Sequence, residues 1–144
     1  IGVVRAANGF SLPVVISFTV ETDGKLPSGI LLKDAIMQVD ASVDQQPLYY
    51  MINCAHPTHF MKELKNDASN EWTNRIMGVR ANASCKSHAE LDEATELDRG
   101  DLKELATHHR DLKKLFTHLN VFGGCCGTDN AHVHEIARQV VGNG

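Results

Sequence analysis

The chain has 144 residues, of which 42% are hydrophobic and 22% are charged, a composition typical of a globular protein with one core. The formal net charge at pH 7 is -4 and no cluster of Lys and Arg occurs, which argues against nucleic acid or an anionic membrane as a partner. No apolar run approaches the roughly 20 residues that span a bilayer, and no charged and apolar leader is recognisable. These features favour a cytoplasmic protein.

Four short apolar runs, each bounded by turn residues, are typical of strands that are covered on both faces, as in a parallel sheet. They span residues 13–19, 48–53, 75–80 and 119–123. Helical patterns alternate with these runs along the chain. The order therefore predicts an α/β fold with a parallel sheet and right-handed crossovers.

Capping residues and apolar positions repeated every three or four residues predict the helices. The helix after Ser28 presents four apolar side chains on one face: Leu32, Ile36, Val39 and Val43. A shorter helix, with Phe60, Met61 and Leu64, follows the second strand. The expected caps are Ser28, Asp101, Asp129 and Ser87, which forms a capping box with Glu90. Residues 1–8 resemble the last turn of a helix, so we expect a fragment of a larger domain.

Two architectures fit this order of elements. One is a small doubly wound sheet, and the other is half of a (β/α)8 TIM barrel, whose usual length is about 250 residues. No GxGxxG or GxxxxGK[ST] phosphate loop follows a predicted strand, which removes the main argument for a doubly wound nucleotide-binding sheet. We therefore predict that residues 1–144 form a single partial domain, half of a barrel.

Three cysteines are expected to converge at one end of this sheet. In both architectures the ligand site lies at the carboxyl ends of the strands, where Cys54 follows the second strand and Cys125 and Cys126 follow the fourth. Glycines on both sides of the adjacent pair free the backbone, so that both sulfurs can reach one ion. Three thiolates leave the fourth tetrahedral position of Zn²⁺ for substrate. The pattern predicts an open zinc site that deprotonates a thiol substrate.

Other interpretations of these residues stay open at this point. Cys125 and Cys126 could be buried structural thiols, or could cycle through a strained disulfide. A closed, non-catalytic zinc site could take His56, His59 or Cys85 as its fourth ligand. Taken alone, Cys85 is expected to be a buried structural cysteine, and the two histidines are expected to be polar residues of a loop or a first helical turn.

Polar residues also follow the first predicted strand and occupy two of the predicted helices. Glu21, after the first strand, could bind a substrate amino group, although Asp23-Gly24 beside it is an ordinary turn signal. Four further histidines receive no role. His108 and His109 form a helical pair that is expected to face solvent, and His132 and His134 lie in the last helix, away from its expected cap.

Two strings, Asn53-Cys54 and Gly123-Gly124-Cys125-Cys126-Gly127-Thr128, closely resemble the zinc motifs of homocysteine S-methyltransferases. The likeness covers essentially the whole chain and extends through Ile16-Ser17-Phe18, Asp23-Gly24, Ser28-Gly29 and Arg80-Ala81-Asn82. Members of that family are (β/α)8 barrels of about twice this length. The resemblance therefore implies that the chain holds roughly the last four β/α units, the carboxyl-terminal half of the barrel.

The resemblance implies zinc-dependent transfer of a methyl group to the sulfur of homocysteine, giving methionine, and hence a role in methionine biosynthesis. It implies Cys54, Cys125 and Cys126 as the zinc ligands, and a sulfonium or ammonium donor such as S-methylmethionine or betaine, or methylfolate in the related methionine synthase module. Glu21 and Asn53 are kept as candidate substrate contacts. The family's amino-group and carboxylate ligands come from early strands that this chain lacks. The missing half or another chain must then complete the barrel, and we expect the fragment alone to bind zinc without methyltransferase activity.

Overall fold

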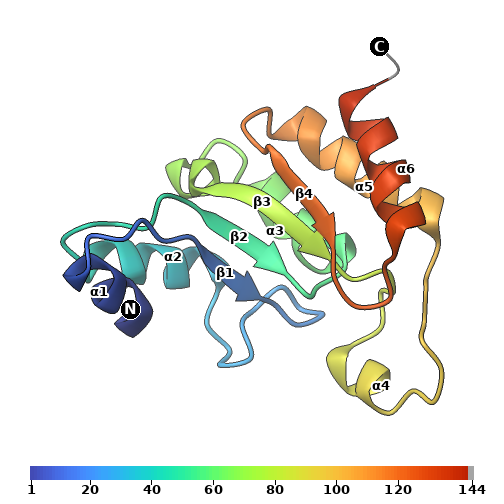
Figure 1. Ribbon diagram of the computed structural model, residues 1–144, viewed down its shortest axis with the longest axis horizontal. Coiled ribbons are helices and arrows are strands. Elements are labelled where there is room, and N and C mark those ends of the chain that lie inside the picture. The colour runs from blue at the N-terminus through green and yellow to red at the C-terminus, as the bar shows by residue number, and fades with distance from the viewer. Residues whose placement is uncertain (143–144) are drawn as a thin grey trace.

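The computed structural model describes residues 1–142 and joins four parallel strands in one sheet (Figure 1). The strands are β1 (Ile16–Thr19), β2 (Tyr50–Asn53), β3 (Ile76–Ala81) and β4 (Val121–Gly124). The helices are α1 (Gly2–Gly9), α2 (Leu32–Ala41), α3 (Pro57–Asn66), α4 (His88–Asp92), α5 (Leu102–Leu115) and α6 (Asn130–Val141), and the 3-10 helix η1 (Glu71–Arg75) precedes β3. The predicted α/β alternation is therefore confirmed.

The chain crosses the sheet in one direction, in the order β1-β2-β3-β4, and every neighbouring pair is parallel. Helices α2, α3 and α5 lie behind the sheet in Figure 1, and α6 packs on α5 beside β4. A doubly wound sheet reverses its strand order and carries helices on both faces. Residues 1–142 show neither feature. Within the same residues, no helix is both long and apolar enough to cross a membrane.

The core lies between the sheet and the helices behind it. On the sheet side, Tyr50 and Ile52 of β2 and Ile76 and Val79 of β3 are no more than 2% exposed. Burying one large apolar side chain stabilises a fold by roughly 1.5–3 kcal/mol. The helices contribute a matching set of buried side chains: Leu32, Ile36, Phe60, Leu64, Leu105 and Leu112.

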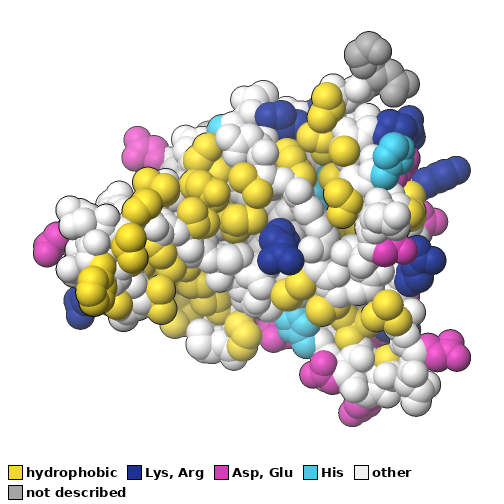
Figure 2. Space-filling model, viewed as in Figure 1, with side chains coloured by type: hydrophobic (Ala, Val, Ile, Leu, Met, Phe, Trp, Pro, Cys, Tyr) yellow, Lys and Arg dark blue, Asp and Glu magenta, His cyan; other side chains and the backbone are white. Residues whose placement is uncertain are grey.

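The opposite face of the sheet is open in the part of the chain that the structure describes. Side chains alternate along a strand, so the residues between the core positions point to this face, and they are exposed or half-buried: Ser17, Thr19, Met51, Asn53, Arg80 and Val121. Figure 2 shows hydrophobic side chains gathered over it. The apolar runs predicted strands covered on both sides, whereas residues 1–142 cover one.

Local capping chemistry predicted three helix starts correctly and one wrongly. The side chain of Asp101 accepts hydrogen bonds from the first turn of α5, Asp129 caps α6, and Ser87 and Glu90 form a capping box on α4. Ser28 caps nothing, because α2 begins after Leu31 with no side-chain cap. The chain around Ser28 is instead a turn closed by a hydrogen bond from the Gly29 amide to the Leu26 carbonyl.

The same helix ends earlier than its apolar pattern suggested. α2 stops at Ala41, so Val43 lies beyond it, although Val43 still packs half-buried against the core. The apolar spacing therefore identified the buried side chain correctly and its secondary structure wrongly.

Two histidines that were expected to lie outside the core and away from the helix cap are buried. His109 is 0% exposed because it shares the inward stripe of α5 with Leu105 and Leu112, and His132 is 1% exposed as the third residue of α6. The ring of His132 joins Asp129 in the capping box, with Nδ1 2.8 Å from the carboxylate. The expectation of a solvent-facing pair at His108 and His109 is wrong for His109, and the expectation that His132 lies away from the cap is also wrong.

Burial lowers the pKa of His109 below its usual value of 6.5, because desolvation disfavours the charged ring. The unfolded chain therefore binds a proton at this histidine more readily than the folded chain does. As a result, the His109 contribution to the free energy of unfolding has its full value above about pH 6.5 and decreases as the pH falls below it. We expect His109→Leu to lose less stability than the wild type between pH 7.5 and 5.5, as measured by urea unfolding. The exposed residue His134, changed to Gln, should keep the wild-type slope; equal slopes for all three proteins would contradict the prediction.

Candidate metal centre

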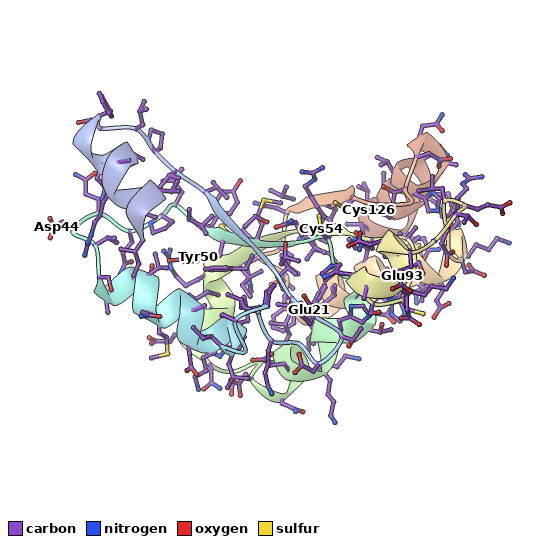
Figure 3. The ribbon with its side chains drawn as sticks, turned by 90° about the horizontal axis from the view of Figure 1, so that it is seen from below. Glu21, Asp44, Tyr50, Cys54, Glu93 and Cys126 are labelled. Carbon is purple, nitrogen blue, oxygen red and sulfur yellow. The ribbon has the colours of Figure 1, made fainter. Side chains whose placement is uncertain are left out.

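The carboxyl ends of the four strands lie along one edge of the sheet, and three cysteines meet there. The sulfur atoms of Cys54, Cys125 and Cys126 all lie within 4.8 Å of one another. Figure 3 shows Cys54 and Cys126 close together at this edge. The parallel register explains the meeting, because Asn53, Arg80 and Gly123 are partners across β2, β3 and β4, which places the following residues at similar heights.

Cys54 leaves the strand in a left-handed backbone conformation, with φ of 52°. For a residue with a Cβ this conformation costs about 1–2 kcal/mol, so other contacts must hold it. The amide of Cys54 donates to the Arg80 carbonyl at 3.0 Å. Its carbonyl accepts from Asn82 Nδ2 at 3.0 Å and from His88 Nε2 at 2.6 Å. These bonds stabilise a sharp turn of the chain at the first cysteine.

The adjacent pair of cysteines lies in a tight turn directly after β4. The Cys125 amide donates to the Ala81 carbonyl at 2.7 Å, and Thr128 Oγ1 donates to the Cys125 carbonyl at 2.7 Å. A Cβ at Gly124 would collide with the Thr128 side chain, and Gly127 has φ of 77°. The flanking glycines therefore allow the turn, as the sequence predicted, one by leaving space and one by its left-handed conformation.

The donor set fits a thiophilic metal ion such as Zn²⁺. With Zn–S bonds of about 2.3 Å, tetrahedral ligands lie about 3.8 Å apart, which small side-chain rotations reach from the observed spacing. Burial raises the pKa of the Cys54 thiol, and its hydrogen bond with Cys125 raises it further. A bound cation favours the thiolate instead, so metal binding would release protons.

No other candidate ligand joins this group among the His, Cys, Asp and Glu residues of 1–142. His56 caps α3 and is 4% exposed, and His59 Nε2 donates to the carbonyl of Cys85 at 2.8 Å. Cys85 is exposed, which contradicts the expectation of a buried cysteine, because it lies in the turn that leads away from the sheet to α4. All four cysteines are free thiols.

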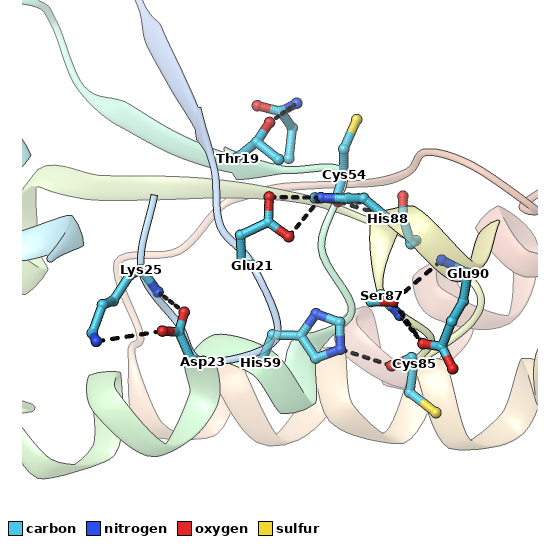
Figure 4. A network of polar contacts seen from close by, with 12 residues as sticks. Thr19, Glu21, Asp23, Lys25, Cys54, His59, Cys85, Ser87, His88 and Glu90 are labelled. Carbon is cyan, nitrogen blue, oxygen red and sulfur yellow. Dashed lines mark hydrogen bonds and ion pairs between the residues drawn. The ribbon is translucent and has the colours of Figure 1, made fainter. Parts of the chain in front are cut away.

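Glu21 and Asn53, the candidate substrate contacts, flank the cysteines but are both engaged. Each oxygen of Glu21 lies 3.2 Å from His88 Nδ1, and His88 links this carboxylate to the Cys54 carbonyl (Figure 4). The hydrogen bond to the Cys54 carbonyl, with Glu21, raises the pKa of His88. Asn53 lies on the open face, where it accepts from Ser17 Oγ at 2.5 Å and donates to Thr19 Oγ1 at 3.1 Å.

The chain matches a known protein family over most of its length. The sequence model of the family described as homocysteine S-methyltransferase matches residues 2–140. The chain belongs to the homocysteine S-methyltransferase family. A search of curated proteins gave no match. The resemblance read from the cysteine and glycine strings is thus confirmed, and the cysteine cluster is the candidate metal centre of a methyltransferase family member.

Sequence reasoning missed two polar residues of this centre. No role was predicted for His88, which lies between the capping residues Ser87 and Glu90, and Asn82 was identified only as part of the string Arg80-Ala81-Asn82. Asn82 lies directly after β3, on the same edge as the cysteines, so the strand-end rule that selected Cys54 was the signal that could have found it. His88 gave no comparable signal, because it reaches the site from α4.

The turn at Gly127 packs directly on the backbone of the segment between α4 and α5. A Cβ on Gly127 would collide with the Asp98 carbonyl, whereas Gly29, with φ of 81°, has no atom within 4 Å of that position. Gly29→Ala should therefore cost about 1 kcal/mol through its backbone alone, and Gly127→Ala roughly 1–3 kcal/mol more. Chemical unfolding of the two variants provides the measurement. Equal losses would show that the contact with Asp98 is unimportant.

Proposed function

We propose that this chain carries the zinc and homocysteine site of a homocysteine S-methyltransferase. The observation that supports the proposal most directly is the meeting of three cysteine sulfurs within 4.8 Å at the carboxyl edge of a parallel sheet. Ligand sites of parallel α/β folds lie at this edge. Family membership adds the substrate class, homocysteine with a small methyl donor.

In this proposal Cys54, Cys125 and Cys126 hold Zn²⁺. When bound there, the ion would supply Lewis acidity that favours the thiolate form of homocysteine. The thiol proton leaves to solvent. The sulfur then attacks the methyl carbon of a sulfonium or ammonium donor, of the S-methylmethionine or betaine type. A new carbon–sulfur bond forms, the bond from the methyl carbon to the donor heteroatom breaks, and its electron pair leaves with the neutral donor product, giving methionine.

Two residues of the chain are proposed to orient the substrate. In addition to the ligands expected from the earlier strands, Glu21 offers a carboxylate to the homocysteine ammonium group, and His88 holds it beside Cys54. Asn53 offers its amide on the open face, one residue before the metal ligand. For Glu21, binding the substrate would mean sharing or replacing the contact with His88.

We also propose that the sheet is the carboxyl-terminal half of a (β/α)8 barrel, roughly its last four β/α units. The one-way strand order, the helices on one side and the open opposite face all match an arc of a barrel wall. Other strands, from the missing half or another chain, would then pair with β1 and β4 and cover the open face. Residues 1–144 alone should lack activity. The proposed setting is cytoplasmic methionine biosynthesis.

The competing hypothesis is a non-catalytic zinc module with a closed site. It needs a fourth protein ligand, and the described His, Cys, Asp and Glu residues provide none close to the three sulfurs. The position facing substrate therefore stays available, which favours the open site.

Zinc content tests the ligand set. We expect about one zinc per chain after purification under reducing conditions, and almost none in Cys54→Ser, because two remaining thiolates bind far more weakly. Cys85→Ser is the matched control: Cys85 is exposed and outside the cluster, so zinc content should not change. Zinc loss in both variants, or in neither, would contradict the assignment.

Addition of homocysteine separates the open site from the closed one. X-ray absorption at the zinc edge should show one more sulfur ligand with homocysteine than without it, and an unchanged ligand shell would favour the closed module. In a titration with homocysteine, Glu21→Gln should bind the substrate about tenfold more weakly than the wild type, because it loses roughly one charged hydrogen bond.

Activity assays of residues 1–144, alone and with the complementary half, test the barrel proposal. Appreciable activity of the fragment alone would contradict it.

A further inference from the structure

The two cysteine segments are bridged by one side chain, that of Asn82. Asn82 is the first residue after β3, and β3 lies between β2 and β4, the strands that lead to Cys54 and to Cys125-Cys126. Asn82 Nδ2 donates to the Cys54 carbonyl at 3.0 Å, and Asn82 Oδ1 accepts from the Cys126 amide at 3.2 Å. A single amide group thus connects backbone on both sides of the candidate metal centre.

The environment of Asn82 fixes this bridge in one orientation. The side chain is 2% exposed, so water does not compete for it. A carbonyl can only accept and an amide N–H can only donate, so the nitrogen of the Asn82 side chain must face Cys54 and the oxygen must face Cys126. The Asn82 backbone is held as well, because its amide donates to the Ala55 carbonyl at 3.2 Å.

The Asn82 side chain binds the backbone at Cys54, the residue of the site that has a strained conformation. Cys54 is left-handed, and its carbonyl direction is set by Asn82 together with His88. Without the Asn82 bond, the turn at Cys54 loses one of the contacts that offset its backbone cost, and the sulfur is free to move away from its neighbours. On the other side, the Ala83 amide donates to the Cys126 carbonyl at 2.9 Å, so the second segment stays attached to β3.

We propose that Asn82 is a positioning residue of the metal centre: its side-chain amide locks the Cys54 and Cys126 segments together, so that their sulfurs share one ion. The inference rests on the proposed zinc site. Outer-shell hydrogen bonds of metal sites commonly contribute 10- to 100-fold to metal affinity. Asn82 acts through the backbone of its two partners and is not itself a ligand.

Two variants remove the bridge in different ways. Asn82→Leu keeps a similar volume and loses both hydrogen bonds, and Asn82→Asp keeps the acceptor but places an oxygen against the Cys54 carbonyl. Zinc affinity is measured on the full chain by competition with a chromogenic chelator, and folding by circular dichroism. Both variants should bind zinc about 10- to 100-fold more weakly than the wild type. For Asn82→Asp the direction is decisive, because a negative charge beside a cation would otherwise strengthen binding.

Thr73→Val is the control for a general loss of stability. Thr73 is 1% exposed and donates from Oγ1 to the Asn70 carbonyl at 2.7 Å, before the start of β3 and away from the cysteines. This variant also loses a buried hydrogen bond, but it should bind zinc like the wild type.

Four results would overturn the inference. Unchanged zinc affinity in both Asn82 variants would reduce Asn82 to a packing residue, and equal weakening in Thr73→Val would assign the effect to global stability. Failure of both Asn82 variants to fold would give Asn82 a role in the fold instead of the metal site. Absence of zinc binding by the wild type would contradict the proposed function, and this inference with it. The first three results leave the proposed function standing.

Discussion

The parallel register of β2, β3 and β4 is the constraint on which the rest of the site depends. It aligns Asn53, Arg80 and Gly123 across the sheet, so the residues that follow each strand emerge together at one edge. Parallel pairing needs a covered crossover between strands, and the helices that provide it also bury Tyr50 and Ile52 against the sheet. Burial of the core and placement of the cysteines are therefore two results of the same pairing.

Beyond the sheet, the centre depends on backbone hydrogen bonds more than on side-chain packing. Cys54 and Cys125 each donate their amide to a carbonyl of β3, and Asn82 and His88 act on the carbonyl of Cys54. Such bonds are each worth only about 0.5–1.5 kcal/mol net, but several of them exceed the cost of one left-handed residue. These bonds hold the backbone of the cysteine segments in place, which limits the conformational entropy that metal binding would cost.

Features set by neighbours in sequence were predictable, and features set by tertiary contacts were not. The caps at Asp101 and Asp129 and the four strands followed from local chemistry, as did the glycine turn after β4. Strand-end reasoning also selected the three cysteines. The prediction of a helix cap at Ser28 was wrong because that segment forms a turn. The prediction that Cys85 is buried was wrong because the general tendency of cysteine to be buried does not account for its place in a projecting turn.

His109 shows a second limit of sequence reasoning. A polar residue next to another histidine suggests solvent, yet the spacing from Leu105 to Leu112 places His109 on the apolar stripe of α5, where its Nδ1 pairs with the Leu105 carbonyl at 2.8 Å. Periodicity outweighed polarity at this position. His88 was harder to predict, since nothing near it in sequence indicates that the first residue of α4 contacts the Cys54 carbonyl.

The close packing of Gly127 on Asp98, together with the ion pair of Lys86 with Asp98, ties the cysteine turn to the segment that carries α4. A Cβ at Gly100 would likewise collide with the Ala83 carbonyl, so the far end of that segment also lies directly on the backbone after β3. The projecting α4 segment and the cysteine turn therefore form one mechanical unit. A displacement of the α4 segment would therefore move the cysteine turn with it, although this segment contributes no sulfur to the three-cysteine cluster.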